Sequence, residues 1–112
     1  MLDGIAKSIE SYMTALSVRE RVIGANIANA DTPGYRTRDV DFEHEFQKAL
    51  KGDSPAITEV NGLQLKNDGN NVSVDREMRA LSETALRFNI ASNFERSEIR
   101  QVRMAMGEGG QS

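Results

Sequence analysis

The sequence predicts a mainly α-helical protein in which long N- and C-terminal helices pack as a coiled-coil-like pair, with a small middle segment outside the pair that contains a short helix and a β-hairpin. Apolar residues recur at helical spacing near both ends of the chain, whereas turn-forming residues are frequent between them. We therefore expect an axial helix over residues 1–30, a turn, a short helix and a β-hairpin over 31–74, and a second axial helix with a flexible tail over 75–112. All three parts should form one structural unit.

The N-terminal helix is indicated by a column of apolar residues that repeats every seven positions. A companion column begins with Ile5 and Tyr12 but becomes polar at Arg19 and Asn26. A one-sided stripe of this length is typical of a coiled-coil seam, although an ordinary core-facing helix gives the same pattern. The column consists of Leu2, Ile9, Leu16, Ile23 and Ala30.

The C-terminal helix should begin at Asp75, which is a good N-cap, and end at Gly107. Its predicted seam comprises Met78, Leu81, Ala85, Phe88, Ser92, Glu95, Ile99, Val102 and Met106. A second apolar row, formed by Leu86, Ile90 and Phe94, runs beside this seam. Because one partner helix cannot cover both rows, we expect a second contact surface. The arginines that alternate with glutamates along this helix predict a solvated or intersubunit face.

The middle segment should contain several short elements. Residues 36–41 are polar and predict an extended stretch, after which Asp41 can cap a short helix that ends near Lys51. Residues 57–60 can pair with residues 63–66 across Asn61-Gly62, a strong signal for a two-residue hairpin turn.

Between the first helix and this segment lies Thr32-Pro33-Gly34-Tyr35, whose proline and glycine positions predict a type II turn. Asn26 and Asn29 precede the turn and share a helix face. Two interpretations are open for them. They are either surface amides at a capped helix end or buried amides that fix the register between helices.

Length and composition restrict the function. With 112 residues the chain forms one domain at most, its core should be small, and subunit contacts should supply part of its stability. A net charge of −3 without a basic block argues against nucleic-acid binding, and the glutamates among the arginines weaken that reading further. Uncharged runs are too short for a membrane helix, and no secretory signal core is present.

Enzymatic chemistry is disfavoured. His44 is the only histidine, cysteine is absent, and neither a nucleophile elbow nor a phosphate-binding loop occurs. The turn cluster at 67–71 lacks the glutamate that an EF-hand loop requires. We therefore expect no metal, no cofactor and no small-molecule substrate. A structural subunit explains the long apolar stripes and the sparse core better than an enzyme does.

Two blocks of sequence resemble a known family. The run Asn26-Ile27-Ala28-Asn29-Ala30-Asp31-Thr32-Pro33-Gly34-Tyr35, followed by Arg36 and Arg38-Asp39-Val40-Asp41-Phe42, resembles the N-terminal signature of the bacterial flagellar basal-body rod proteins. Asp68-Gly69-Asn70-Asn71-Val72, followed by Asp75-Arg76-Glu77, is similar to the segment that opens the family's C-terminal helix.

The resemblance implies a structural subunit of the proximal rod, exported without a cleaved signal peptide into the periplasm-spanning part of the basal body. The implied partners are copies of itself, other rod proteins, rod-base adaptor and membrane-ring components, and the flagellar type III export gate. The resemblance also assigns an assembly motif at the corner where helix becomes outer loop, comprising Asn26, Ile27, Asn29, Asp31, Thr32, Pro33, Gly34 and Tyr35. Another rod or hook paralogue and a cytoplasmic helical-hairpin adaptor remain as alternatives.

Overall fold

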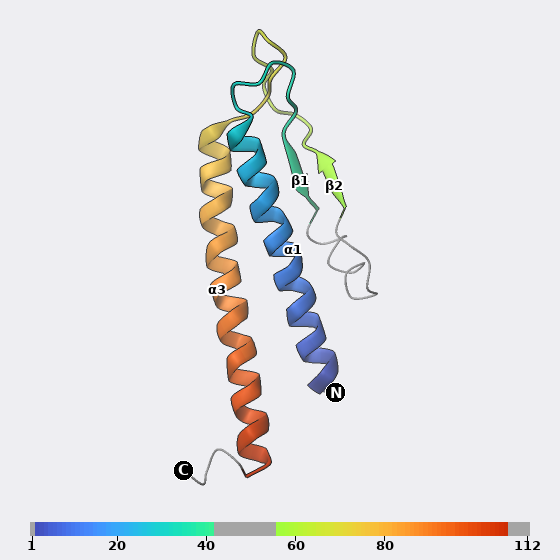
Figure 1. Ribbon diagram of the computed structural model, residues 1–112, viewed down its shortest axis with the longest axis vertical. Coiled ribbons are helices and arrows are strands. Elements are labelled where there is room, and N and C mark those ends of the chain that lie inside the picture. The colour runs from blue at the N-terminus through green and yellow to red at the C-terminus, as the bar shows by residue number, and fades with distance from the viewer. Residues whose placement is uncertain (1, 42–55, 108–112) are drawn as a thin grey trace.

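The computed structural model describes residues 2–41 and 56–107. The described elements are helix α1 (Leu2–Ala28), strand β1 (Arg38–Val40), strand β2 (Ile57–Glu59) and helix α3 (Val74–Ala105). The two helices pack side by side in opposite directions, and α1 lies between α3 and the two strands (Figure 1). This arrangement confirms the predicted mainly α-helical fold with a long helical pair.

The molecule is elongated and flat. Its principal extents are 65 × 28 × 17 Å, and its radius of gyration is 18.1 Å. A compact domain of this length would have a radius of gyration of about 13 Å. The molecule is elongated because it is built on two long helices, and it is flat because these helices pack side by side in a single layer.

The core is small, as the composition predicts. Its largest apolar side chains come from α1, where Leu16 and Ile23 of the predicted column are fully buried. Ile9 and Ala30 of the same column are half-buried, and the side chain of Leu2 is not among those that the structure describes. The buried apolar side chains in the described residues are Ala15, Leu16, Val22, Ile23, Val40, Val72, Ala80 and Ala91.

The face of α3 that contacts α1 differs from the predicted seam. Met78 and Ile99 are 53% and 47% exposed, and Met106 is also exposed, while Leu81, Phe88 and Val102 are half-buried. Each residue turns a helix by about 100°, so a shift of one position moves a side chain off the contact. The face toward α1 carries small or hydrogen-bonded residues that allow a close approach, and the large apolar residues lie on its flanks. The buried residues of α3 are Glu77, Ala80, Thr84 and Ala91.

The start of α3 also differs from the prediction. Ser73, rather than Asp75, is the N-cap, and its hydroxyl accepts a hydrogen bond from the backbone N–H of Arg76 at 3.3 Å. Asp75 lies in the first turn, where a carboxylate still interacts favourably with the helix dipole. At the other end Gly107 has a φ of 80°, which confirms the predicted glycine stop.

The middle segment contains an antiparallel two-stranded sheet, but the predicted pairing of 57–60 with 63–66 is wrong. β2 pairs with β1 in the register Arg38 with Glu59, Asp39 with Thr58 and Val40 with Ile57. Residues 63–66 form no strand, and the N–H of Lys66 donates to the carbonyl of Asn70 at 2.8 Å instead.

The physical reason for this pairing is that β1 is anchored. Val40 and Thr37 are buried, so β1 offers a fixed edge to which β2 can add. β1 also confirms that residues 36–41 include an extended stretch. The short helix predicted from Asp41 to Lys51, together with His44, falls within 42–55 or at its border and lies outside the described residues.

We expect Gly24→Ala to stabilise the protein by about 0.5–1 kcal/mol, because alanine loses less backbone entropy in a helix than glycine. Gly24 is an exposed residue inside α1, and a Cβ there would have no atom within 4 Å. Thermal melting followed by circular dichroism at 222 nm would measure the gain. An unchanged or lower melting temperature would show that α1 is not a continuous helix at this position.

Candidate functional site

The chain changes direction at the turn that follows α1. The backbone N–H of Tyr35 donates to the carbonyl of Thr32 at 3.2 Å, and Gly34 has a φ of 76°. With Pro33 as the second residue of the turn, this geometry agrees with the predicted type II turn. Glycine is required here because L-residues rarely adopt such a φ.

The segment leading into α3 packs against this turn. The N–H of Gly34 donates to the carbonyl of Asp68 at 2.9 Å, and the N–H of Asn71 donates to the carbonyl of Tyr35 at 3.2 Å. The two sequence blocks that carry the family resemblance therefore meet in space and form one unit. We call this unit the corner; it comprises residues 26–40 and 66–77.

Asn70 fastens the second block to the end of α1. Its side chain is fully buried, and its Nδ2 donates to the carbonyls of Asn29 at 2.9 Å and Thr32 at 2.8 Å. Its Oδ1 accepts from the N–H of Val72 at 2.8 Å. The carbonyls of Asn29 and Thr32 also accept backbone N–H bonds from Thr32 and Tyr35, so the Asn70 amide adds a second donor to each and ties the second block to the turn.

Asn71 fastens the same block to the sheet. Its Oδ1 accepts from the N–H of Thr37 at 2.6 Å, and the Thr37 hydroxyl donates to the carbonyl of Asn71 at 3.2 Å. Thr37 in turn accepts from the N–H of Val60 at 2.9 Å. The buried residues Thr37 and Asn71 thus join the chain segments before β1, after β2 and before α3, and the bond to the segment after β2 is made by the backbone carbonyl of Thr37.

Asn26 occupies the centre of the corner. Its side chain is 0% exposed. Its Nδ2 donates to the carbonyl of Arg38 at 2.8 Å and to Oε1 of Glu77, while its Oδ1 accepts from the Tyr35 hydroxyl at 3.0 Å and from the N–H of Arg38 at 3.2 Å. Of the two interpretations of this residue, the buried one is confirmed. The amide joins α1, β1 and α3 within one chain.

The rest of the predicted assembly motif lies nearer the surface. Asn29 is half-buried, and its Nδ2 donates to the carbonyl of Ala25 at 2.8 Å, so it caps the end of α1. Ile27 is half-buried, and Asp31, Thr32 and Pro33 are exposed. The motif therefore has a buried part, centred on Asn26, and a surface part at the tip of the turn.

Five charged residues connect the corner to the helices. Arg19 of α1 contacts Asp39 at 3.1 Å and Glu83 at 3.2 Å, and Asp39 also contacts Arg76 at 3.2 Å. The guanidinium of Arg76 also forms an ion pair with the carboxylate of Glu77 at 2.9 Å. Because Arg19 and Asp39 have little exposure, this network is screened less than the surface pairs Arg79–Asp75 and Arg87–Glu83, each of which contributes about 0.2–0.5 kcal/mol.

Glu77 is the buried charge of this network, with 1% of its surface exposed. Burial raises the pKa of the Glu77 carboxyl above its ordinary value of 4.5, because the charged form loses its hydration. The nearby carboxylate of Asp39 acts in the same direction. The hydrogen bond from Asn26 and the charge of Arg76 oppose the rise without cancelling it.

This shift predicts a pH dependence of stability. Between pH 4.5 and the raised pKa, the folded chain holds a proton on Glu77 that the unfolded chain has lost, so the stability from this group falls as pH rises. We expect the unfolding free energy of the wild type, minus that of Glu77→Gln, to decrease as pH increases above 4.5. Urea unfolding of both proteins at a series of pH values above 4.5 measures this difference. A difference that is constant or that grows in favour of wild type would contradict the prediction.

Sequence reasoning missed the role of several of these residues. The sequence pattern places Glu77 only among the glutamates of the solvated arginine–glutamate face, and Arg19 only where the companion column becomes polar. A signal for both was available. Arg19 and Asn26 are seven residues apart in the same column, and Glu77, Thr84 and Ala91 repeat with the same spacing on α3. All three of these α3 residues are buried.

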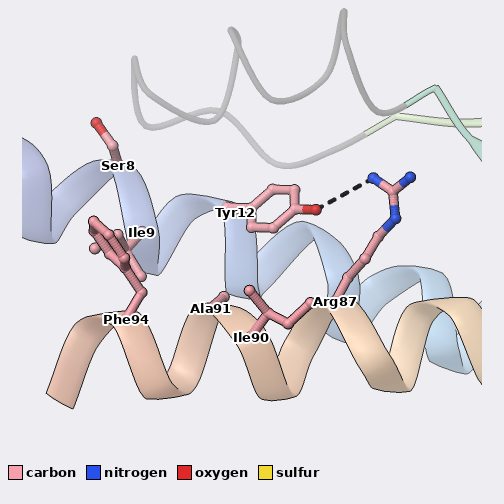
Figure 2. Close-up of a pocket in the computed structure, with 7 residues that line it drawn as sticks. All are labelled: Ser8, Ile9, Tyr12, Arg87, Ile90, Ala91 and Phe94. Carbon is pink, nitrogen blue, oxygen red and sulfur yellow. Dashed lines mark hydrogen bonds between the residues drawn. The ribbon is translucent and has the colours of Figure 1, made fainter. Parts of the chain in front are cut away.

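An apolar groove of about 350 Å³ runs between the N-terminal half of α1 and the middle of α3 (Figure 2). Its floor includes Ala91, and the Arg87 guanidinium donates to the Tyr12 hydroxyl at 3.3 Å at one end of it. The second predicted row borders this groove and is open, since Leu86 and Ile90 are each 60% exposed and Phe94 is 53% exposed. The residues that line the groove are Ser8, Ile9, Tyr12, Arg87, Ile90, Ala91 and Phe94.

Other kinds of site are not found within residues 2–41 and 56–107. No group of three or more histidine, cysteine, aspartate or glutamate side chains in these ranges could hold a metal ion. Neither helix combines the length and the apolar character needed to cross a membrane. In the same ranges every buried side-chain nitrogen and oxygen has a hydrogen-bond partner, so the corner holds no unsatisfied polar group that would point to a ligand.

Comparison with known proteins agrees with this geometry. The profile of the family described as "Flagella basal body rod protein" matches residues 10–36, which span the last two thirds of α1 and the turn. The flagellar basal body rod protein FlgB of Buchnera aphidicola is 32% identical over 115 aligned positions, covering 83% of this chain and 86% of that protein.

Two further relatives carry the same name. The FlgB protein of Salmonella typhimurium is 29% identical and covers 98% of this chain and 99% of its own length. That of Borrelia hermsii is 28% identical and covers 85% of this chain and 90% of its own length. These matches extend over both helices and both blocks of the corner, and the chain therefore belongs to the FlgB family of flagellar basal body rod proteins.

Proposed function

We propose that this chain is a structural subunit of the proximal rod of the flagellar basal body, and that it assembles through its terminal helices into the tubular drive shaft and export conduit. The observation that carries the proposal is the corner. Two sequence blocks from opposite halves of the chain interlock through buried asparagines, and they hold α1 and α3 as one elongated body. A rigid, elongated subunit suits a shaft that transmits torque.

The exposed apolar side chains of α3 support assembly in particular. Ile90, Phe94 and Met104 are more than half exposed although they lie on a long, ordered helix. Such an accumulation of exposed apolar residues marks a protein-interaction surface. We propose that residues 1–30 and 75–112 form the inner, axial part of the subunit and that residues 31–74 lie outside it.

The proposed partners are copies of this chain, other rod proteins, rod-base adaptor and membrane-ring components, and the flagellar type III export gate. The proposed location is the periplasm-spanning rod, reached by export without a cleaved signal peptide. We propose no catalytic activity.

The test is to look for the chain in purified basal bodies from its source bacterium. We expect mass spectrometry to find it there at a constant ratio to other rod proteins, and we expect an in-frame deletion to yield basal bodies without a complete rod. A chain that stays in the soluble cell fraction and is absent from basal bodies would contradict the proposal and favour the cytoplasmic adaptor. Detection of the chain in the hook fraction instead of the rod would favour another axial paralogue.

A further inference from the structure

Asn61-Gly62 is the only Asn-Gly pair in the sequence, and it lies in the stretch that joins β2 to the corner (Figure 1). Both residues are exposed, and a Cβ built at Gly62 would meet no atom within 4 Å. In such a pair the backbone nitrogen of the glycine can attack the side-chain amide carbon of the asparagine, because glycine has no Cβ to hinder the approach. The surroundings of the pair decide whether this attack can occur in the folded protein.

The backbone around the pair is free of native hydrogen bonds. The N–H of Val60 donates to the carbonyl of Thr37 at 2.9 Å, and the next backbone bond along the chain starts from Lys66. Within the part of the chain that the structure describes, residues 61–65 form no hydrogen bond. The amide of Gly62 therefore has no native bond to give up before it reacts, and the stretch can bend into a five-membered ring without opening the sheet or the corner.

The corner contains the opposite case at Asp68-Gly69, where the same ring closure would start from an aspartate. The N–H of Gly69 donates to the carbonyl of Lys66 at 3.0 Å, and the Asp68 side chain accepts from the N–H of Asn70 at 3.0 Å. The Asp68 carbonyl also accepts from the N–H of Gly34 at 2.9 Å. Native bonds hold both the attacking nitrogen and the attacked side chain, so this pair cannot cyclise without disrupting the corner.

Other asparagines are protected by their surroundings or by the residue that follows them. Asn70 and Asn71 are buried, and their side chains are engaged in hydrogen bonds. Asn89 and Asn93 lie inside α3, where the following N–H is bonded within the helix. Asn67 is exposed, but the aspartate after it places a side chain and a negative charge beside the attacking nitrogen.

We propose that Asn61 is a site of spontaneous deamidation that consumes water and needs no enzyme. The nitrogen of Gly62 forms a bond to Cγ of Asn61, the Cγ–Nδ2 bond breaks, and ammonia leaves with the proton lost by the glycine nitrogen. Water then opens the succinimide ring. Attack of water at Cγ gives aspartate, whereas attack at the backbone carbonyl carbon gives isoaspartate, whose main chain runs through Cβ.

Either product replaces a neutral amide with a carboxylate and so adds one negative charge to a chain whose net charge is −3. Because residues 61–65 make no native hydrogen bonds, the product should leave the melting temperature nearly unchanged. The modified chain would therefore accumulate in the folded state. This inference is independent of the proposed function.

Peptide mapping tests the inference. Trypsin releases Asn61 in the peptide 52–66, and the adjacent peptide 67–76 carries three other asparagines as an internal control. The full chain is incubated in a mildly alkaline buffer at physiological temperature, both folded and in guanidinium chloride, and mass spectrometry follows the two peptides from a zero-time sample onward. Deamidation appears as a gain of about 1 Da. Asn61→Gln is the control variant, because a glutamine side chain would have to close a less favourable six-membered ring.

We expect peptide 52–66 of the folded protein to deamidate at a rate within about threefold of its rate in guanidinium chloride, because no native bond protects it. In the folded protein, peptide 67–76 should react at least about tenfold more slowly than peptide 52–66. Peptide 52–66 of Asn61→Gln should gain no mass. A rate for peptide 52–66 that falls about tenfold or more on folding would overturn the inference, as would a mass gain that persists in Asn61→Gln.

Discussion

Replacing Asn26 with leucine is expected to cost about 3 kcal/mol or more of folding free energy and to abolish motility. Leucine has a branched shape like that of asparagine but is larger and makes no hydrogen bond, so the change would leave the backbone N–H and carbonyl of Arg38 without their partner. It would also remove a donor from the buried carboxyl of Glu77. Unpartnered buried polar groups cost about 1–3 kcal/mol each, and a buried charge costs more.

Asn29→Leu is the matched control for this prediction, since it makes the same substitution three residues later on α1. The Asn29 side chain is half-buried and bonds only to Ala25 and Thr32 near the surface. We expect it to cost about 1 kcal/mol at most. Thermal melting and swimming in soft agar measure both effects. Equal losses at the two positions would show that Asn26 has no special part in the corner.

Replacing Gly34 with valine is expected to cost about 2 kcal/mol or more and to prevent assembly of the rod. With a φ of 76°, this residue lies in the left-handed region, which β-branched residues resist. A Cβ at this position would meet no atom within 4 Å, so the effect comes from the backbone and not from a steric clash. Relaxing the strain would move the Gly34 N–H away from Asp68 and release the second block of the corner.

Gly34→Asn separates backbone conformation from side-chain size, because asparagine tolerates the left-handed region better than valine does. We expect this variant to melt between wild type and Gly34→Val and to retain partial swimming. Should the valine strain swim normally, the turn would not be a requirement for assembly.

The parts of the fold that depend on neighbouring residues could be predicted from the sequence. The two helices follow from the apolar period, the turn from Pro33 and Gly34, and the end of α3 from Gly107. Each of these signals acts over a few residues. The structure agrees with the positions of these elements, apart from the first turn of α3, where Ser73 and Asp75 are both competent caps and only the structure distinguishes them.

The parts that depend on contacts between distant residues could not be predicted. The signal at Asn61-Gly62 favours a local hairpin, but the anchored edge of β1 pairs with β2 instead. Hydrophobicity assigned Met78 and Ile99 to the helix contact, whereas Glu77, Ala80 and Thr84 occupy it. The hydrogen bond from Asn26 and the charge of Arg76 reduce the cost of burying Glu77, and a single sequence does not show such cooperation.

The central claim is that the corner holds α1 and α3 of one chain together as the unit that assembles. A density map of the native rod, at a resolution that shows side chains, tests this claim most directly. We predict that every copy has Asn26 between Tyr35 and Glu77 of the same chain, with α1 and α3 antiparallel. A map in which the two helices of one chain are separated, with Asn26 away from its own Glu77, would contradict it.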